Sequence, residues 1–256
     1  MGKIISISNQ KGGVGKTTTS INLSAALGAR GKKVLVIDMD PQGNTTSGLG
    51  FNKKEIKLSS YDVLEKDTLA NEAILKTPFN NLNLIPSHIN LASADAGITL
   101  FSGKESKLKH KISDVKNEYD YIIIDCPPSL GIITINAFCA SDSVLIPIQC
   151  EYYALEGLSQ LINTIKVVKR HHNSELEIEG ILMTMCDLRL NLTKQVMDEV
   201  QKGFPGKVFK TTIPRTVKIS EAPGFGKPVM YFSRLNPGTW AYKNLAKEII
   251  KNNENN

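Results

Sequence analysis

The chain has 256 residues, of which 41% are hydrophobic and 22% charged, and its formal net charge is +6. A chain of this length is long enough for one large α/β domain or at most two small ones, and we expect one. The composition is that of an ordinary soluble globular protein and excludes wholesale disorder, and no apolar run approaches membrane-spanning length. The four cysteines form no C-x-x-C pair, so neither a zinc site nor a disulfide framework is indicated, and a reducing cytoplasm fits best.

The first predicted strand is short, and a glycine-rich loop follows it directly. Apolar residues alternate between Ile4 and Ile7, which leaves no room for a signal peptide, and helical spacing begins at Ser20. Backbone N–H groups of such a loop surround an anion, and the helix dipole adds positive charge. We therefore predict a nucleoside triphosphate site, with Lys16 at the β- and γ-phosphates and Thr17 on Mg²⁺. The loop reads Lys11, Gly12, Gly13, Val14, Gly15, Lys16, Thr17 and Thr18.

The second predicted strand ends in acidic residues. Val34 to Asp38 is a continuous apolar run of the kind found in a parallel strand that is buried on both faces. Asp38 and Asp40 follow the run, and open α/β sheets bind ligands at the carboxyl ends of their strands. The pattern itself leaves open whether these aspartates serve the phosphate site or only form the turn at Pro41.

The next part of the chain has weaker signals. Residues 43–80 are rich in small polar residues and are predicted to be a surface excursion with a helix at 61–64. A strand at 82–86 and helices at 90–100 and 104–118 follow. The lysines of the last helix are interpreted first as solvated surface and only second as contacts for DNA.

A second strong motif lies at Tyr121 to Asp125, an apolar strand that ends in an aspartate. This is the Walker-B arrangement, so Asp125 is predicted to bind Mg²⁺, usually through one of its waters. The paired prolines that follow make residues 127–131 a candidate switch that senses the γ-phosphate. Cys126 is interpreted as an inert packing residue.

Strands and helices then alternate regularly. Helices are predicted at 132–139, 154–171, 193–202 and 238–251, and strands at 143–148, 179–185 and 207–209. This alternation predicts a mostly parallel sheet with helices on both faces, in one domain over residues 1–251 with a polar flexible tail at 252–256. Between Lys202 and Arg234 there are seven basic residues against the single acid Glu221. This excess is as consistent with a polyanionic partner as with a merely solvated surface.

Two strings, K-G-G-x-G-K-T-T at the first loop and D-x-D-P-Q-G-N after the second strand, resemble the ParA/Soj family of the ParA/MinD superfamily. The resemblance covers residues 2 to 251 and implies a P-loop ATPase that uses ATP and Mg²⁺. It implies that Lys11 reaches across a homodimer to the partner's nucleotide. It also implies that Asp40 positions or activates the attacking water, and that Asp38 supports the Mg²⁺ shell.

Two later segments, 183–189 and 213–223, are also similar to the ParA/Soj family. The resemblance implies DNA contacts by Arg189, Arg215 and Lys218, and contacts to the adenine by Met185 and Pro214. It further implies a role in chromosome or plasmid partition. By this resemblance, an ATP-bound dimer is expected to bind double-stranded DNA on the nucleoid without sequence preference, and hydrolysis stimulated by a ParB/Spo-type centromere-binding protein is expected to release it.

Three other functions compete with this interpretation. A MinD-like membrane ATPase ends in an amphipathic helix, whereas residues 251–256 here contain no apolar residue. A reductase related to the nitrogenase iron protein needs paired cysteines for an Fe–S cluster, and only Cys126, Cys139 and Cys150 lie in the relevant region. A sequence-specific repressor of this family carries an N-terminal helix-turn-helix domain, for which no residues precede the first strand. We expect none of the three.

Overall fold

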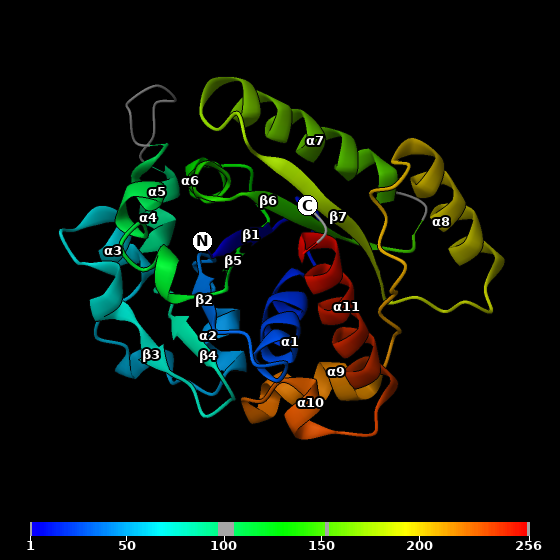
Figure 1. The fold of residues 1–256 in the computed structure, drawn as a ribbon, viewed down its shortest axis with the longest axis horizontal. Coiled ribbons are helices and arrows are strands. Elements are labelled where there is room, and N and C mark those ends of the chain that lie inside the picture. Colours follow the sequence, from blue (N-terminus) through cyan, green and yellow to red (C-terminus); the bar gives the residue numbers. More distant parts are fainter. Residues whose placement is uncertain (1, 97–104, 152–153, 255–256) are drawn as a thin grey trace.

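The computed structural model describes residues 2–96, 105–151 and 154–254, which form a seven-stranded sheet with helices on both faces (Figure 1). The strand order is β3-β4-β2-β5-β1-β6-β7, and all neighbours are parallel except the antiparallel pair β3 and β4. The predicted fold class is therefore confirmed. The strands are β1 (Lys3–Ile7), β2 (Val34–Asp38), β3 (Leu75–Lys76), β4 (Leu82–Ile85), β5 (Tyr121–Asp125), β6 (Ser143–Gln149) and β7 (Glu177–Thr184).

The central strands are apolar on both faces. In β1, Ile5 and Ile7 belong to one core cluster and Ile4 to the opposite one. In β5, Ile123 and Ile122 separate in the same way. Successive side chains of a strand point to opposite faces, so two apolar cores require the uninterrupted apolar runs that the sequence shows.

Helices bury both faces. α1 and α11 contact each other on one face, where they lie side by side, and α6 joins the core clusters of the other face, to which α3, α5, α7 and α8 contribute (Figure 1). The helices among the described residues are α1 (Lys16–Gly28), α2 (Asn44–Gly48), α3 (Ser60–Glu65), α4 (Leu91–Ala96), α5 (Lys107–Lys111), α6 (Ile132–Ala140), α7 (Ala154–His171), α8 (Asn191–Gly203), α9 (Val217–Glu221), α10 (Val229–Phe232) and α11 (Pro237–Glu254).

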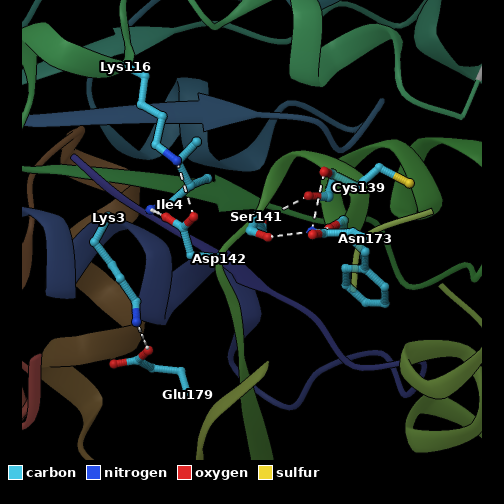
Figure 2. A network of polar contacts seen from close by, with 10 residues as sticks. Lys3, Ile4, Lys116, Cys139, Ser141, Asp142, Asn173 and Glu179 are labelled. Atoms are coloured by element: carbon cyan, nitrogen blue, oxygen red, sulfur yellow. Dashed lines mark hydrogen bonds and ion pairs between the residues drawn. The ribbon is translucent and has the colours of Figure 1, made fainter. Parts of the chain in front are cut away.

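A polar network fixes the amino-terminal edge of the sheet (Figure 2). The Asp142 carboxylate accepts hydrogen bonds from the Ile4 N–H at 2.7 Å and from Lys116 Nζ at 3.1 Å, which ties the start of β1 to the segment before β6. The Asn173 amide donates to backbone carbonyls at the end of α6, including that of Ser141 at 2.7 Å. The orphan carbonyls of the helix terminus are thereby satisfied. This network therefore lies at the amino-terminal ends of the strands, and the glycine loop begins at their carboxyl-terminal ends.

The segment 43–80 is not the surface excursion that the sequence predicted. It contains α2, α3 and the edge strand β3, together with 3-10 turns at Lys53–Glu55 and Ala70–Ala73. Val63 and Leu64 of α3 are buried in the core against β2 and β4. The pattern was obscure because these elements are short and separated by polar turns.

The predicted helix at 104–118 is interrupted in the structure. In place of a helix at 104–118 the described residues form α5 and a 3-10 turn at Lys116–Glu118, because Ser113 Oγ donates to the His110 carbonyl and the Asp114 carboxylate accepts from the Val115 N–H. The start of that helix at residue 104, and the end of the predicted helix 90–100 beyond Ala96, lie outside the described residues.

The predicted strand 207–209 is only one isolated bridge, between Val208 and Ile181 of β7. The ladder stops there because the next two backbone N–H groups, of Lys210 and Thr211, donate to the carboxylate of Glu248 on α11, at 2.7 and 3.0 Å. A side chain from another helix therefore replaces a strand partner.

The last helix also differs from its prediction. α11 continues through Glu254, so the predicted end at Lys251 is three residues early, and Asn253 donates to Glu179 at 3.0 Å. Leu245 and Ile249 of this helix are buried, whereas Trp240 is 54% exposed. No helix among the described residues is long and apolar enough to cross a membrane.

Candidate functional site

The glycine loop connects β1 to α1. Gly13 and Gly15 have φ values of +76° and +90°, in the left-handed region that side chains disfavour. A Cβ at Gly12 or Gly13 meets nothing within 4 Å, so both positions border open space. Gly15 caps α1 without a side-chain hydrogen bond, which leaves the first N–H groups of the helix available to an anion.

Two side chains that the sequence analysis missed hold this loop in place. Asn9 donates to the Pro147 carbonyl at 2.7 Å and accepts from the Lys11 N–H at 2.9 Å. The buried Thr184 hydroxyl, at the end of β7, contacts the Val14 carbonyl at 2.8 Å and the Ile148 carbonyl at 3.1 Å. The loop is thus attached to the carboxyl ends of β6 and β7. No local pattern marks these residues, because their partners lie far away in the sequence.

The two lysines of the loop lie in different environments. Lys16 is buried, and its ammonium donates to the Lys11 carbonyl at 3.0 Å inside the loop. Burial lowers the pKa of Lys16, while the charges of Asp125 and Asp40 oppose the shift. Lys11 is partly exposed and pairs with Glu151 at 2.7 Å, a residue that the sequence analysis did not select. One lysine therefore faces the site and the other faces outward.

Asp125 is fully buried at the end of β5, and three hydroxyl groups surround it. Its two oxygens accept from Ser20 Oγ at 2.9 Å and from Thr45 Oγ1 at 2.7 Å. Burial raises the pKa of Asp125 to about 6, against the hydrogen bonds from Thr45, Ser20 and Thr17. The predicted metal residues Thr17 and Asp125 are therefore brought together, and Ser20 and Thr45 join them without a signal in the sequence.

Asp38 lies on the neighbouring strand, paired in register with Asp125. Its carboxylate accepts from the backbone N–H of Thr46 at 2.8 Å and from its hydroxyl at 2.7 Å. Burial, with the charge of Asp125 as the second cause, raises the pKa of Asp38 to about 8. The short helix α2 therefore serves both aspartates, with Thr45 on one and Thr46 on the other.

Asp40 sits just past the end of β2, where the chain turns. Its carboxylate accepts from the Gln42 N–H at 2.9 Å, and its carbonyl accepts from Ser87 Oγ at 2.5 Å. These contacts fix the turn after β2, and this turn positions the Asp40 carboxylate. Asp40 is close enough to Lys16 for its charge to affect the pKa of that ammonium.

The donor set fits a small hard cation that keeps part of its water shell. No group of three or more His, Cys, Asp or Glu within the described ranges could hold a metal ion by itself. Mg²⁺ is usually bound by one or two protein oxygens together with waters and phosphate oxygens, so a protein cage is not required. The hydroxyl of Thr17 and the carboxylate of Asp125 are of the right chemical type.

A cavity of about 240 Å³ opens beside the start of α1. Gly15 and Thr18 of the loop line it, and so do Met185 and Pro214, the two residues predicted to contact a base. A parallel bridge between Cys186 and Pro214 brings their segments together. The cavity therefore continues from the phosphate loop toward the residues expected at the adenine.

The three residues predicted to contact DNA follow β7 in the chain, and all three are exposed. The Arg189 side chain is 88% exposed and binds Asp187 through two hydrogen bonds, at 2.8 and 2.6 Å. Lys218 on α9 pairs with Glu221 at 2.9 Å. Arg215 is exposed and lines the rim of the cavity. Arg189 and Lys218 are thus held by carboxylates of their own chain.

All four cysteines are buried. Cys126 is buried, and burial raises the pKa of its thiol. All four cysteines are free, and no cluster of metal-binding cysteines occurs in the part of the chain that the structure describes.

A parallel sheet with a glycine loop between its central strand and α1, and a buried aspartate on the adjacent strand, defines a P-loop nucleoside triphosphatase. A family model described as AAA domain matches residues 2–178. The chain is 55% identical over 252 residues to the sporulation initiation inhibitor protein Soj of Bacillus subtilis, covering 98% of this chain and 100% of the relative. It is 47% identical to the chromosome partitioning protein ParA of Myxococcus xanthus, covering 98% of this chain and 89% of the relative.

The chain belongs to the ParA/Soj family of partition ATPases, within the ParA/MinD superfamily. A solved structure with the same fold, named cobyrinic acid a,c-diamide synthase from Mycobacterium smegmatis with bound ADP and magnesium, superposes with a TM-score of 0.86. It is 33% identical and covers 98% of this chain and 95% of that one. The family that the sequence motifs predicted is confirmed.

Proposed function

We propose that this chain is a DNA-partitioning ATPase in which an ATP-bound dimer binds double-stranded DNA without sequence preference. Family membership supports ATP-dependent partition in general. The single observation that carries the finer proposal is the opposite placement of two lysines in one loop: Lys16 is buried at the phosphate site, whereas Lys11 reaches outward to Glu151. A lysine on the outer surface is available to a second copy.

In this proposal the loop from Gly12 to Thr18 and the buried ammonium of Lys16 hold the phosphates of ATP. Mg²⁺, when bound, supplies positive charge that stabilises the transferred phosphoryl group. Thr17 and Asp125 bind it, directly or through water, and Asp38 orders this region through Thr46. Asp40, fixed in its turn by Gln42 and Ser87, orients the attacking water.

Met185 and Pro214 contact the adenine from the wall of the 240 Å³ cavity. Arg189, Arg215 and Lys218 contact phosphates of the DNA, because exposed cations give affinity without sequence readout. A ParB-type partner stimulates hydrolysis and so releases the DNA, and the protein acts in the cytoplasm on the nucleoid.

The test is sedimentation and DNA binding of the purified protein with ATP, with ADP and without nucleotide, all with Mg²⁺. We expect a dimer and DNA binding only with ATP. Lys16→Ala should abolish nucleotide binding, whereas Lys11→Ala should keep it and lose the dimer. Lys32→Ala, which removes another surface lysine with an ion pair to Glu254, is the matched control and should behave as the wild type. A protein that remains a monomer with saturating ATP, or binds DNA equally without nucleotide, contradicts the proposal.

A further inference from the structure

Two cysteines that the proposed function does not use lie against each other at the rim of the site. Cys150 follows the last residue of β6, and Cys186 lies two residues beyond the end of β7. Their sulfur atoms are 3.1 Å apart. A disulfide requires about 2.05 Å, so a movement of about 1 Å joins the two sulfurs.

The pair is held in place from several sides. The last paired residues of the two strands are Gln149 and Thr184, so the ladder delivers both cysteines to the same edge. The Cys186 N–H donates to the Ile213 carbonyl at 2.9 Å, and its backbone bridges to Pro214. The ends of β6 and β7 therefore bring the two cysteines close to each other.

The pair is also more accessible than the other two thiols. Cys150 and Cys186 are 9% and 5% exposed, whereas Cys126 and Cys139 are 1% and 0% exposed. A small oxidant reaches the pair first. The hydrogen bond between the two thiols lowers the pKa of Cys150 and raises that of Cys186. Cys150 is the more exposed of the two, so we assign it as the attacking sulfur, which reacts in its thiolate form.

We propose that Cys150 and Cys186 form a redox-modification site, a dithiol that a peroxide converts into an intramolecular disulfide and that a dithiol reductant restores. In the first step the Cys150 sulfur attacks one peroxide oxygen. The S–O bond forms, the O–O bond breaks, and the leaving hydroxide takes a proton to become water. In the second step the Cys186 sulfur attacks the Cys150 sulfenic acid, the S–S bond forms and a second water leaves. The two thiols lose two electrons and two protons, and the peroxide is reduced to two waters.

The location gives the modification a consequence, which rests on the proposed function. Cys150 precedes Glu151, the partner of Lys11, and Cys186 follows Met185, which lines the 240 Å³ cavity. Met185 already has a φ of +52°, so its backbone has little freedom to adjust when Cys186 moves. We expect the oxidised protein to bind nucleotide about fivefold more weakly than the reduced protein, a coupling at the low end of ordinary allosteric effects.

The decisive experiment is peptide mapping of the intact protein after treatment with hydrogen peroxide, without reductant. A protease that cleaves after acidic residues releases peptides 143–151 and 180–187, each with one cysteine of the pair, and keeps Cys126 and Cys139 together in peptide 126–142. We expect peptides 143–151 and 180–187 to appear as one linked species that has lost two hydrogen atoms and separates on reduction. Unlinked peptides, or oxidation of Cys126 or Cys139 first, overturn the proposal.

Variants separate the site from the consequence. Cys150→Ala and Cys186→Ala should each abolish the linked species, and Cys139→Ala, which removes a more deeply buried thiol, should retain it. Nucleotide affinity of the wild type is then compared before and after oxidation, by titration with a fluorescent ATP analogue. A disulfide that leaves this affinity unchanged overturns the coupling to the site. A reduced wild type that binds no nucleotide refutes the proposed function instead, because the disulfide mapping does not depend on it.

Discussion

The hydroxyl of Thr184 is the group whose removal tests most directly how the loop is held. It is buried at the end of β7 and lies 2.8 Å from the Val14 carbonyl and 3.1 Å from the Ile148 carbonyl. Thr184→Val keeps the shape of the side chain and removes only the hydroxyl. The Val14 carbonyl, inside the glycine loop, then loses its contact to the sheet.

The size of the effect follows from burial. A buried acceptor left without its donor costs about 1–3 kcal/mol. We expect the free energy of unfolding to fall by that amount. Part of this lost free energy stabilises the conformation of the loop that binds nucleotide. A change of 1.4 kcal/mol corresponds to about a tenfold change in an equilibrium constant. Nucleotide affinity should therefore fall by up to about tenfold.

The assay combines chemical denaturation with titration of a fluorescent nucleotide analogue. Thr239→Val is the matched control. Thr239 lies on the first turn of α11, is also buried, and donates its hydroxyl to the Ser233 carbonyl at 2.7 Å. Both variants should lose stability, but only Thr184→Val should lose affinity. Equal nucleotide affinity in the two variants would show that the hydroxyl supports the fold and does not shape the loop.

Three further predictions concern the aspartates and the exposed cations. Asp40→Ala should bind ATP with an affinity close to that of the wild type and hydrolyse it at least about a hundredfold more slowly, since positioned proton acceptors contribute about 10²–10⁴-fold; normal phosphate release would remove Asp40 from this role. The pKa of Asp38 is raised from 3.8 to about 8, so the folded chain binds this proton more tightly than the unfolded chain does. The free energy of unfolding of the nucleotide-free protein should therefore decrease as the pH rises between these values, and Asp38→Asn should flatten the dependence measured by urea unfolding; an unchanged slope would contradict the assignment. Arg189→Ala should weaken DNA binding evenly across sequences and reduce the salt dependence by about one ion, whereas Arg170→Ala, at an exposed position on α7, should do neither. Loss of ATP-dependent dimerisation in Arg189→Ala would instead place this residue at the subunit interface.

The fold was predictable wherever one strand supplies its own signal. The runs that become β2 and β5 are apolar throughout because both faces of these strands are buried, and each ends in an aspartate at the edge of the sheet. The glycine loop was equally clear, since its backbone conformation requires glycine at Gly13 and Gly15. These features are local, so a single sequence displays them.

The supporting residues were not predictable, because their contacts join distant parts of the chain. Thr45 reaches Asp125 across 80 positions, and Thr184 reaches Val14 across 170. A threonine in a polar stretch or at a strand end has no distinctive pattern. The broken strand at 207–209 has the same cause, since the carboxylate that interrupts it, of Glu248, belongs to another helix.

The buried aspartates explain why a bound cation should stabilise this end of the sheet. Asp38 and Asp125 are fully buried on adjacent strands, and burial together with their mutual repulsion disfavours the charged forms. Hydroxyl groups such as those of Thr45 and Thr46 reduce this cost by donating hydrogen bonds, but a hydroxyl carries no charge. A cation would favour both ionised forms. Ionisation of both carboxylates without a cation lowers the free energy of unfolding, so a cation that binds only the folded chain should raise this free energy most at the pH where both carboxylates are ionised.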